Sequence, residues 1–265
     1  MKSLSQKDII CFRKMVWNFY NTHGRDFPWR RTRNPYRILV SELMLQQTQT
    51  ERVMKKYKEF ISLFPTFRRL AHASLHEVLS VWQGLGYNRR ALFLKRTAEI
   101  VDKKYRGHIP RDEKTLRTLP GIGRGTAGAL SAFAFDVPTA FIETNIRRVY
   151  IHRFFAERKN ISDTELLRYV EKTVDTKNPR EWYYALMDYG SFLGKAERKN
   201  PNVKSAHYKK QSPFRGSERE LRGKILRVIL TSKNRAPIFI SKKTEISVTS
   251  VKRILLALRK EGFLG

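Results

Sequence analysis

Residues 42–49 read Glu-Leu-Met-Leu-Gln-Gln-Thr-Gln, and residues 119–123 read Leu-Pro-Gly-Ile-Gly. The first stretch places a carboxylate beside a row of side-chain amides, and the second is a glycine turn that opens a run of small residues. A second acid, Glu143, comes after that turn and just before Asn145. Two acids and a turn whose backbone N–H groups can bind an anion indicate cleavage of a bond on a nucleic-acid backbone or base.

The sequence around Glu42 predicts a helix from Tyr36 to about Gln49, with apolar residues on both sides of the acid. A carboxylate among so many apolar side chains is costly to bury as a charge. Glu42 is therefore either paired with an arginine or raised in pKa for proton transfer. From the residues alone, the structural pair is the slightly better explanation.

Two glycine turns offer candidate contacts to nucleic acid. The turn at 119–123 and the small-residue run at 126–130 predict a helix–hairpin–helix, whose N–H groups would face a phosphate, although a plain helix-to-helix turn fits as well. The turn Gly84-Leu85-Gly86 leaves Tyr87 exposed. An exposed aromatic on a basic surface can wedge into a base stack, or it can anchor its own loop.

Apolar spacing and turn residues predict a chain that is mostly helical, since strand patterns are rare. A helix is also expected to begin near Thr144, with Glu143 exposed at its start. The remaining predicted helices are 6–20, 51–63, 74–81, 88–104, 163–175 and 179–193.

The charge of the chain narrows the class of partner. Among 265 residues, 54 are basic and 24 acidic, which gives a net charge of +30 and attracts polyanions such as nucleic acid. No apolar run is long enough to span a bilayer, and the N-terminus lacks the apolar core of a signal peptide. The protein is therefore expected inside the cell, in the cytoplasm or nucleoid, with no membrane partner.

The single cysteine, Cys11, excludes an intramolecular disulfide and a cysteine cluster for zinc or iron–sulfur. Its apolar helical neighbours predict a buried structural thiol.

The composition shifts after Gly194. Residues 195–222 are basic and broken by prolines, which fits a solvated linker or a clamp on the DNA backbone. Residues 218–265 carry two helical apolar stripes and predict a three-helix, winged-helix-like tail with a short or missing wing, too short to be sure of folding alone.

Several motifs in order carry a resemblance to a known family. They are Trp29, Asn34-Pro35-Tyr36, residues 41–49, Trp82-Gln83-Gly84-Leu85-Gly86-Tyr87, residues 119–123, Thr126-Ala127-Gly128-Ala129 and residues 185–190. Over residues 8–215 the chain resembles the helix–hairpin–helix DNA glycosylases, and within them the MutY-type adenine glycosylases. The resemblance implies an all-α, two-domain fold with DNA bound across a cleft. The chain is therefore expected to have a terminal helical domain of residues 1–29 plus 139–215, with a loop at 194–210, and a helical-barrel domain of residues 30–138. The tail, 218–265, follows them as a third part outside the resemblance.

The resemblance also implies roles for individual residues. Glu42 would protonate the ring of a flipped adenine, Glu143 would stabilise the sugar cation, and Asn145 would orient the site. Gln46 and Gln47 would probe the opposite base, and Tyr87 would wedge into the stack. Further DNA contacts would come from Thr48, Leu85, Gly121, Gly123, Arg124, Gly125, Thr126 and Arg147.

The chain departs from the family pattern at four places. Glu143 stands where aspartate is usual, and Gly125 stands where lyase-active relatives carry lysine, so no Schiff base can form there. The four cluster cysteines are replaced by Gly194, Pro201, Lys204 and Lys210, so no cofactor and no metal are expected. The domain that recognises 8-oxoguanine is not visible, and a helical tail takes its place.

These observations predict a monomeric, monofunctional DNA glycosylase that acts on double-stranded DNA with a mismatched or damaged base. It would remove adenine opposite guanine or 8-oxoguanine by hydrolysis of the N-glycosidic bond, without strong lyase activity. One alternative is a thymine or uracil glycosylase acting on G:T or G:U mismatches. The other is a catalytically impaired protein that binds lesions or DNA.

Overall fold

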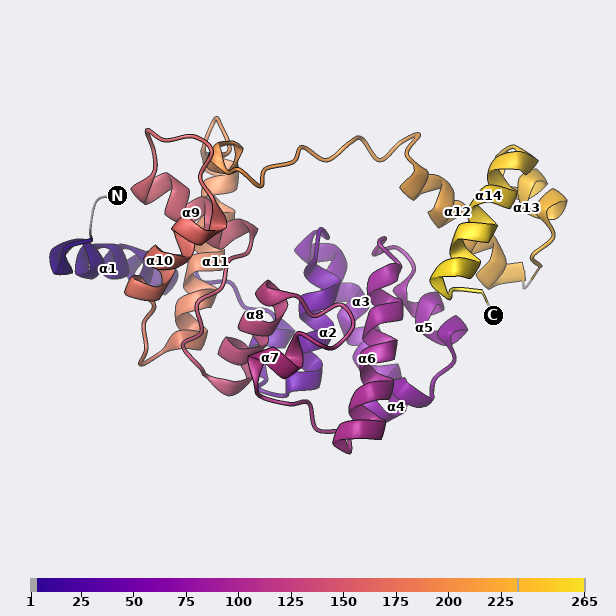
Figure 1. Cartoon of the computed structure of the whole chain (residues 1–265), viewed down its shortest axis with the longest axis horizontal. Helices are drawn as coiled ribbons and strands as arrows, with labels where there is room; N and C mark the ends of the chain where they lie inside the picture. The colour runs from indigo at the N-terminus through magenta and orange to yellow at the C-terminus, as the bar shows by residue number, and fades with distance from the viewer. Residues whose placement is uncertain (1–3, 233, 265) are drawn as a thin grey trace. The chain divides into compact units, whose positions relative to one another are not determined.

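The computed structural model describes residues 4–232 and 234–264, and helices make up its regular structure (Figure 1). The described residues contain 14 α-helices and two short 3-10 helices. Their only β-type pairing is an isolated bridge between Ile161 and Ser205. The all-α prediction is therefore confirmed, while a wing in the tail is not shown.

The helices group into two compact units, and the division falls within α2 (Pro35–Leu45), directly after Glu42. The first unit contains residues up to 42 and 110–210. Besides the start of α2, its elements are α1 (Gln6–His23), η1 (Pro28–Arg31), α7 (Glu113–Leu116), α8 (Arg124–Phe135), α9 (Thr144–Phe154), α10 (Asp163–Thr173), α11 (Pro179–Ala196) and η2 (Pro201–Lys204).

The second unit contains residues 43–109 together with those from 211 onward. The tail thus belongs to the same unit as residues 43–109, although it is far from them in the sequence. After the end of α2, its elements are α3 (Thr50–Leu63), α4 (Phe67–His72), α5 (Leu75–Trp82), α6 (Arg89–Tyr105), α12 (Glu218–Ser232), α13 (Pro237–Thr244) and α14 (Val248–Glu261).

The core of the first unit forms around α9 and α11, which pack side by side. Phe12 of α1 contributes a fully buried ring that lies 5.2 Å from Tyr150 and 5.8 Å from Trp182, measured between ring centroids. Rings at such separations add favourable quadrupole contacts to the burial of their surface. This core fixes the N-terminus of α9, where Glu143 stands.

Gly190 allows the two central helices to approach closely. A Cβ atom at this position would lie 2.3 Å from the backbone oxygen of Asn145, far inside van der Waals contact. Any larger residue would push α11 away from the start of α9. A glycine in α11 therefore sets the position of the residues that begin α9.

Hydrogen bonds and packing hold the segment after α11. Asn202 donates from Nδ2 to the Thr144 carbonyl at 2.9 Å, and Arg148 donates from Nε to the Asn200 side chain at 3.1 Å. Gly194 lies against the Arg148 guanidinium, where a Cβ atom would be 2.6 Å from Nη1. Packing and hydrogen bonds tie this loop to α9.

The tail forms three helices, α12 to α14, and α12 packs on α5 within the second unit. The ring nitrogen Nε2 of His76 lies 2.9 Å from the Leu230 carbonyl oxygen. Val251, Ile254 and Leu258 of α14 are buried, as their spacing predicted. The tail therefore packs against α5 of the second unit through α12 and has buried apolar residues of its own.

Two local predictions are wrong. The helix through Glu42 ends at Leu45 and does not continue to Gln49, because Gln47 takes a left-handed φ of 55° that breaks the helical path. Cys11 is exposed, because α1 turns Phe12 and Val16 into the core instead.

None of the helices among residues 4–232 and 234–264 is long and apolar enough to cross a bilayer.

Candidate active site

Glu42 lies on α2 and is half-buried, with Leu39, Val40 and Leu43 fully buried around it. Removal from water, with a smaller contribution from repulsion by the Glu143 carboxylate, raises the pKa of its carboxyl to about 8 against the opposing effect of Arg30. No ion pair to Glu42 occurs in the part of the chain that the structure describes. Of the two interpretations of Glu42, the structure supports the raised pKa.

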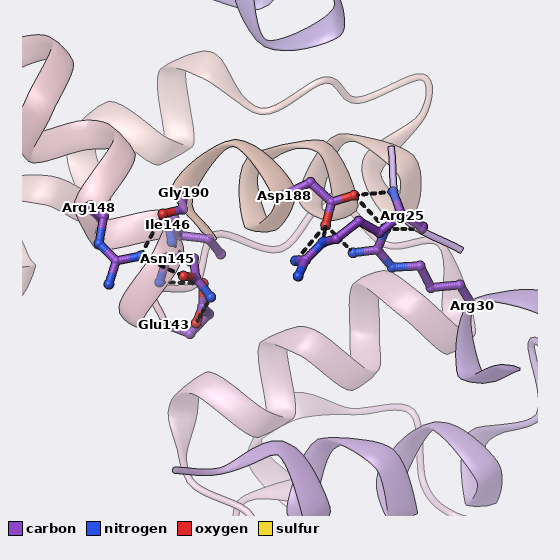
Figure 2. A network of polar contacts seen from close by, with 8 residues as sticks. All are labelled: Arg25, Arg30, Glu143, Asn145, Ile146, Arg148, Asp188 and Gly190. Carbon is purple, nitrogen blue, oxygen red and sulfur yellow. Dashed lines mark hydrogen bonds and ion pairs between the residues drawn. The ribbon is translucent and has the colours of Figure 1, made fainter. Parts of the chain in front are cut away.

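Arg30 does not neutralise Glu42 because Asp188 holds it. The buried Asp188 carboxylate accepts from Arg30 Nη1 at 2.8 Å and Nη2 at 2.7 Å, and from Arg25 at 2.8 Å (Figure 2). The Arg30 guanidinium also lies over the Tyr184 ring, 4.4 Å from its centroid. With its charge committed to Asp188, Arg30 lowers the pKa of Glu42 less than burial raises it.

Glu143 is the N-cap of α9. Its Oε1 accepts from the backbone N–H groups of Asn145 at 2.7 Å and Ile146 at 2.8 Å, which curls the side chain back onto the helix (Figure 2). Burial raises the pKa of this carboxyl, and the two N–H groups oppose that shift. The predicted exposure of Glu143 is wrong, since the cap leaves it half-buried.

Asn145 connects Glu143 to the body of the unit. Its Nδ2 donates to Glu143 Oε2 at 3.3 Å, and its Oδ1 accepts from Arg148 Nη1 at 2.8 Å (Figure 2). The same Arg148 nitrogen donates to the Gly190 carbonyl oxygen. Burial lowers the pKa of Arg148, and the Glu143 carboxylate opposes that shift. The chain Glu143–Asn145–Arg148–Gly190 fixes the direction in which the carboxylate points.

The first unit thus contains two carboxyls in different environments. Burial raises the pKa of both, to about 8 for Glu42, while at Glu143 the backbone N–H groups of Asn145 and Ile146 oppose the shift. A neutral acid beside an anion can protonate a leaving group and stabilise a developing cation. That is the chemistry needed to break a glycosidic bond.

The turn at 119–123 leads directly into α8. Gly121 has a φ of 78°, which favours glycine, and Gly123 forms the N-cap of α8 without any side-chain cap. Arg124 is exposed, and a Cβ on Gly123 would meet no atom within 4 Å, so this face is open. The N-terminus of α8 can therefore bind a phosphate. Gly125 and Thr126 lie in the first turn of the same helix.

In the second unit, Arg90 joins the loop after α2 to the loop before α6. Its guanidinium donates to Leu43 and Met44 carbonyls at 2.8 Å and to the Gln46 carbonyl. It also donates to Thr48 Oγ1 at 3.1 Å, and to the carbonyls of the turn at 84–86. Burial lowers the pKa of Arg90 to about 10, so it still carries its charge at neutral pH.

Each of these loops has a side chain on a left-handed backbone. Gln47 has a φ of 55° and Tyr87 a φ of 45°, conformations that L-residues adopt only when the surroundings impose them. Gln47 is exposed, whereas Tyr87 is half-buried and not exposed as predicted. The Leu85 side chain is buried and anchors its loop. Arg90 thus binds the residues on either side of Gln47 and the backbone carbonyl of Tyr87.

The structure places the predicted residues in two groups. Glu42, Glu143, Asn145 and the turn at 119–126 lie in the first unit, and Gln46, Gln47, Thr48, Leu85 and Tyr87 in the second. Arg147, also a predicted DNA contact, makes two hydrogen bonds to Asp163, at 2.7 and 2.8 Å.

Sequence reasoning missed Arg30, Arg148 and Arg90 as residues that organise these groups. Their positions show no periodicity or motif that separates them from the other basic residues of the chain. The one available signal was Arg90 following the glycine turn by a few residues, at the start of a predicted helix.

No group of three or more potential metal ligands occurs among residues 4–232 and 234–264. The one cysteine of the sequence, exposed on α1, cannot supply the thiolates of an iron–sulfur cluster.

The chain is similar to known DNA repair proteins. The family described as "HhH-GPD superfamily base excision DNA repair protein" matches residues 40–175. The chain is 35% identical over 189 residues to an adenine DNA glycosylase of Buchnera aphidicola, covering 69% of this chain and 53% of that one. It is 32% identical over 197 residues to a thymine/uracil-DNA glycosylase of Methanothermobacter thermautotrophicus, covering 73% and 89%.

A solved structure of a thermostable thymine-DNA glycosylase superposes with a TM-score of 0.67 at 32% identity, covering 75% of this chain and 92% of that one. The chain spans about half the length of several of the curated adenine DNA glycosylases that it matches.

Proposed function

Because this chain belongs to the HhH-GPD superfamily of base excision DNA repair proteins, we propose that it is a DNA glycosylase that removes adenine mispaired with guanine or 8-oxoguanine. The observation that carries the proposal is Glu42, a carboxyl with a pKa of about 8 in the same unit as the capped carboxylate of Glu143. The reaction is hydrolysis of the bond between the base and C1′ of the deoxyribose.

Glu42 acts as the general acid. Its proton passes to a ring nitrogen of the extruded adenine, and the C1′–N9 bond breaks with its electron pair leaving on the base. Adenine needs this proton because it is a poor leaving group when unprotonated. Thymine and uracil can leave as stabilised anions, so a carboxyl held neutral at pH 7 favours adenine as the target.

Glu143 stabilises the sugar cation that remains. Its carboxylate faces positive charge that develops on C1′ and the ring oxygen, and Asn145 holds its orientation. A water molecule then adds to C1′, and the proton that it loses restores the acid form of Glu42. The products are free adenine and an abasic site with both DNA strands intact.

The base must leave the duplex before this chemistry, at a cost of a few kcal/mol. Phosphate binding by residues 121–126 at the start of α8, and contacts from Gln46, Gln47 and Tyr87, supply part of that free energy. Gly125 offers no amine for a Schiff base, so the enzyme is monofunctional and leaves the strand uncut.

A thymine or uracil glycosylase acting on G:T or G:U mismatches is the second candidate. It is favoured by a relative with that printed activity, at 32% identity and with 89% of its length covered. A protein that only binds lesions is disfavoured by the buried acid of Glu42, because desolvating a carboxyl gives binding no advantage.

The decisive experiment incubates the protein with duplexes that carry A:G, A:8-oxoguanine, G:T or G:U pairs. We expect alkali-dependent breaks at adenine, with Glu42→Gln lowering the single-turnover rate by about 10²–10⁴-fold while duplex binding is retained. Glu171→Gln is the matched control, since Glu171 is an exposed carboxylate of α10.

Base release from G:T or G:U alone would replace the proposal by the second candidate. Strand breaks before alkali treatment would refute the monofunctional mechanism, and unchanged turnover in Glu42→Gln would refute the role of Glu42.

A further inference from the structure

The segment that follows residue 210 reaches the two loops held by Arg90. Gln211 donates from Nε2 to Gln47 Oε1 at 3.1 Å and also contacts the Tyr87 hydroxyl. Arg219, on the first turn of α12, donates from Nη1 to the same hydroxyl at 2.6 Å. These contacts join residues more than a hundred positions apart in the sequence, so they belong to the tertiary structure of the second unit.

Arg219 is itself held in place. Its Nη2 donates to the Ser212 carbonyl at 2.7 Å, and its guanidinium lies 5.7 Å from the centroid of the Tyr87 ring. Arg90 lies over the same ring at 5.4 Å. The Tyr87 hydroxyl has few acceptor positions, and it is thus hydrogen-bonded by two residues that follow residue 210, Gln211 and Arg219.

These contacts use acceptor atoms of both side chains. Gln211 takes one of the two acceptor positions of the Gln47 side-chain oxygen, while the Gln47 NH₂ group can act only as a donor and so suits a ligand that accepts hydrogen bonds. The Tyr87 hydroxyl oxygen accepts from Gln211 and Arg219. Guanine presents two adjacent acceptors, O6 and N7, on one edge, whereas adenine and cytosine each present an amino donor there.

We infer that Gln211 and Arg219 are specificity-determining positioning residues, which orient Gln47 and Tyr87 to select guanine as the base opposite the extruded one. The inference rests on the proposed function for the identity of the ligand, a duplex with one base removed from the stack. It adds Gln211 and Arg219, which lie outside the site formed by Glu42 and Glu143, to the residues that determine substrate specificity.

The test measures preference for the opposite base without requiring catalysis. Fluorescence anisotropy gives the affinity for two duplexes with a tetrahydrofuran abasic analogue, one opposite guanine and one opposite cytosine. We expect the unaltered protein to prefer guanine, and Arg219→Ala or Gln211→Ala to reduce that preference by about fivefold to tenfold, the loss expected for one hydrogen bond.

Arg227→Ala is the matched control, because it removes the same charge from an exposed position on the same helix. It should weaken binding to both duplexes equally and leave the ratio unchanged. Gln211 is exposed, so Gln211→Ala keeps the fold, and thermal melting verifies this for every variant.

Two outcomes would overturn the inference: equal affinity of the unaltered protein for both duplexes, or an unchanged ratio in both variants. A protein that prefers guanine in this assay but releases no base from any duplex would refute the proposed function and leave the inference standing.

Discussion

The pKa of Glu42 depends more on the surrounding residues than on the intrinsic acidity of a glutamate. A glutamate in water has a pKa near 4.5 and is an anion at neutral pH. Here apolar neighbours remove water, Glu143 repels the charge, and the arginine that would stabilise the anion is taken by Asp188. These three effects together raise the pKa of Glu42, which is the property that the proposed proton donor needs.

The raised pKa predicts a bell-shaped pH profile for base release. The rate should fall about tenfold per pH unit above pH of about 8, where Glu42 loses its proton, and fall again at low pH as Glu143 gains one. Single-turnover rates between pH 4 and 10 measure both limbs. A rate that keeps rising through pH 9 would contradict Glu42 as the acid.

The raised pKa of Glu42 also makes the free energy of unfolding depend on pH. Between pH 4.5 and about 8 the folded chain holds the Glu42 proton and the unfolded chain does not. Rising pH across this window therefore lowers the free energy of unfolding. Glu42→Gln should remove that part of the pH dependence in thermal melting.

Glu143 can be exchanged for a shorter acid but not for a neutral amide. Aspartate is itself a strong N-cap residue and can accept from the Asn145 and Ile146 N–H groups, so Glu143→Asp should keep the rate within about tenfold. Glu143→Gln keeps the size and loses the charge, and should lower the rate by about 10²–10³-fold. Single-turnover base release compares the two variants directly.

A complete loss in Glu143→Asp would show instead that the site requires the longer side chain. Equal rates in Glu143→Gln and the unaltered protein would remove the anion from the mechanism.

At the scale of elements, the close contact between α9 and α11 aligns the site. Arg148 of α9 donates both to Asn145 and to the Gly190 carbonyl, so the helix contact and the Glu143 orientation share one guanidinium. A displacement of α11 is therefore transmitted to the carboxylate.

Gly190→Ala should test this coupling. The added Cβ would lie 2.3 Å from the Asn145 oxygen, and the resulting overpacking should lower the free energy of unfolding by about 1–3 kcal/mol. Base release should slow as well, because Asn145 moves. Chemical denaturation and single-turnover kinetics measure the two effects.

Gly223→Ala serves as the control, since a Cβ at this position of α12 meets no atom within 4 Å. It should stabilise the protein by about 0.5–1 kcal/mol through helix propensity. A Gly190→Ala variant as stable and active as this control would show that α9 and α11 can accommodate the added Cβ without displacement.

At the scale of the whole molecule, the net charge bears on the proposed binding of DNA. The chain has 54 basic and 24 acidic residues, and this excess of +30 attracts any duplex regardless of its sequence. Specific recognition must come from the few side chains that the loops and the α8 turn present.

Duplex affinity should consequently fall about a thousandfold between 50 and 200 mM salt, because the release of counterions from DNA becomes less favourable as the salt concentration rises. Fluorescence anisotropy across a potassium chloride series measures the slope. Raising osmolarity with sucrose instead should leave the affinity unchanged. A flat salt profile would contradict electrostatic binding.

The sequence by itself determined the helical class, because apolar spacing and glycine or proline breaks are local signals. The helices α1, α3, α5, α6, α10 and α11 begin within one residue of their predicted starts. It also supplied Glu42, Glu143 and Asn145 as candidates, since their types and order carry the family resemblance. It did not locate the end of α2, which a left-handed Gln47 decides.

The tertiary structure alone decided which form each acid takes. Whether Glu42 is paired or protonated depends on Asp188, which lies 146 residues away in the chain and holds Arg30 first. Which side chains support Tyr87 depends on Arg90, Gln211 and Arg219, which no local pattern joins. Burial and long-range hydrogen bonds set pKa and orientation, and both arise only when distant segments meet.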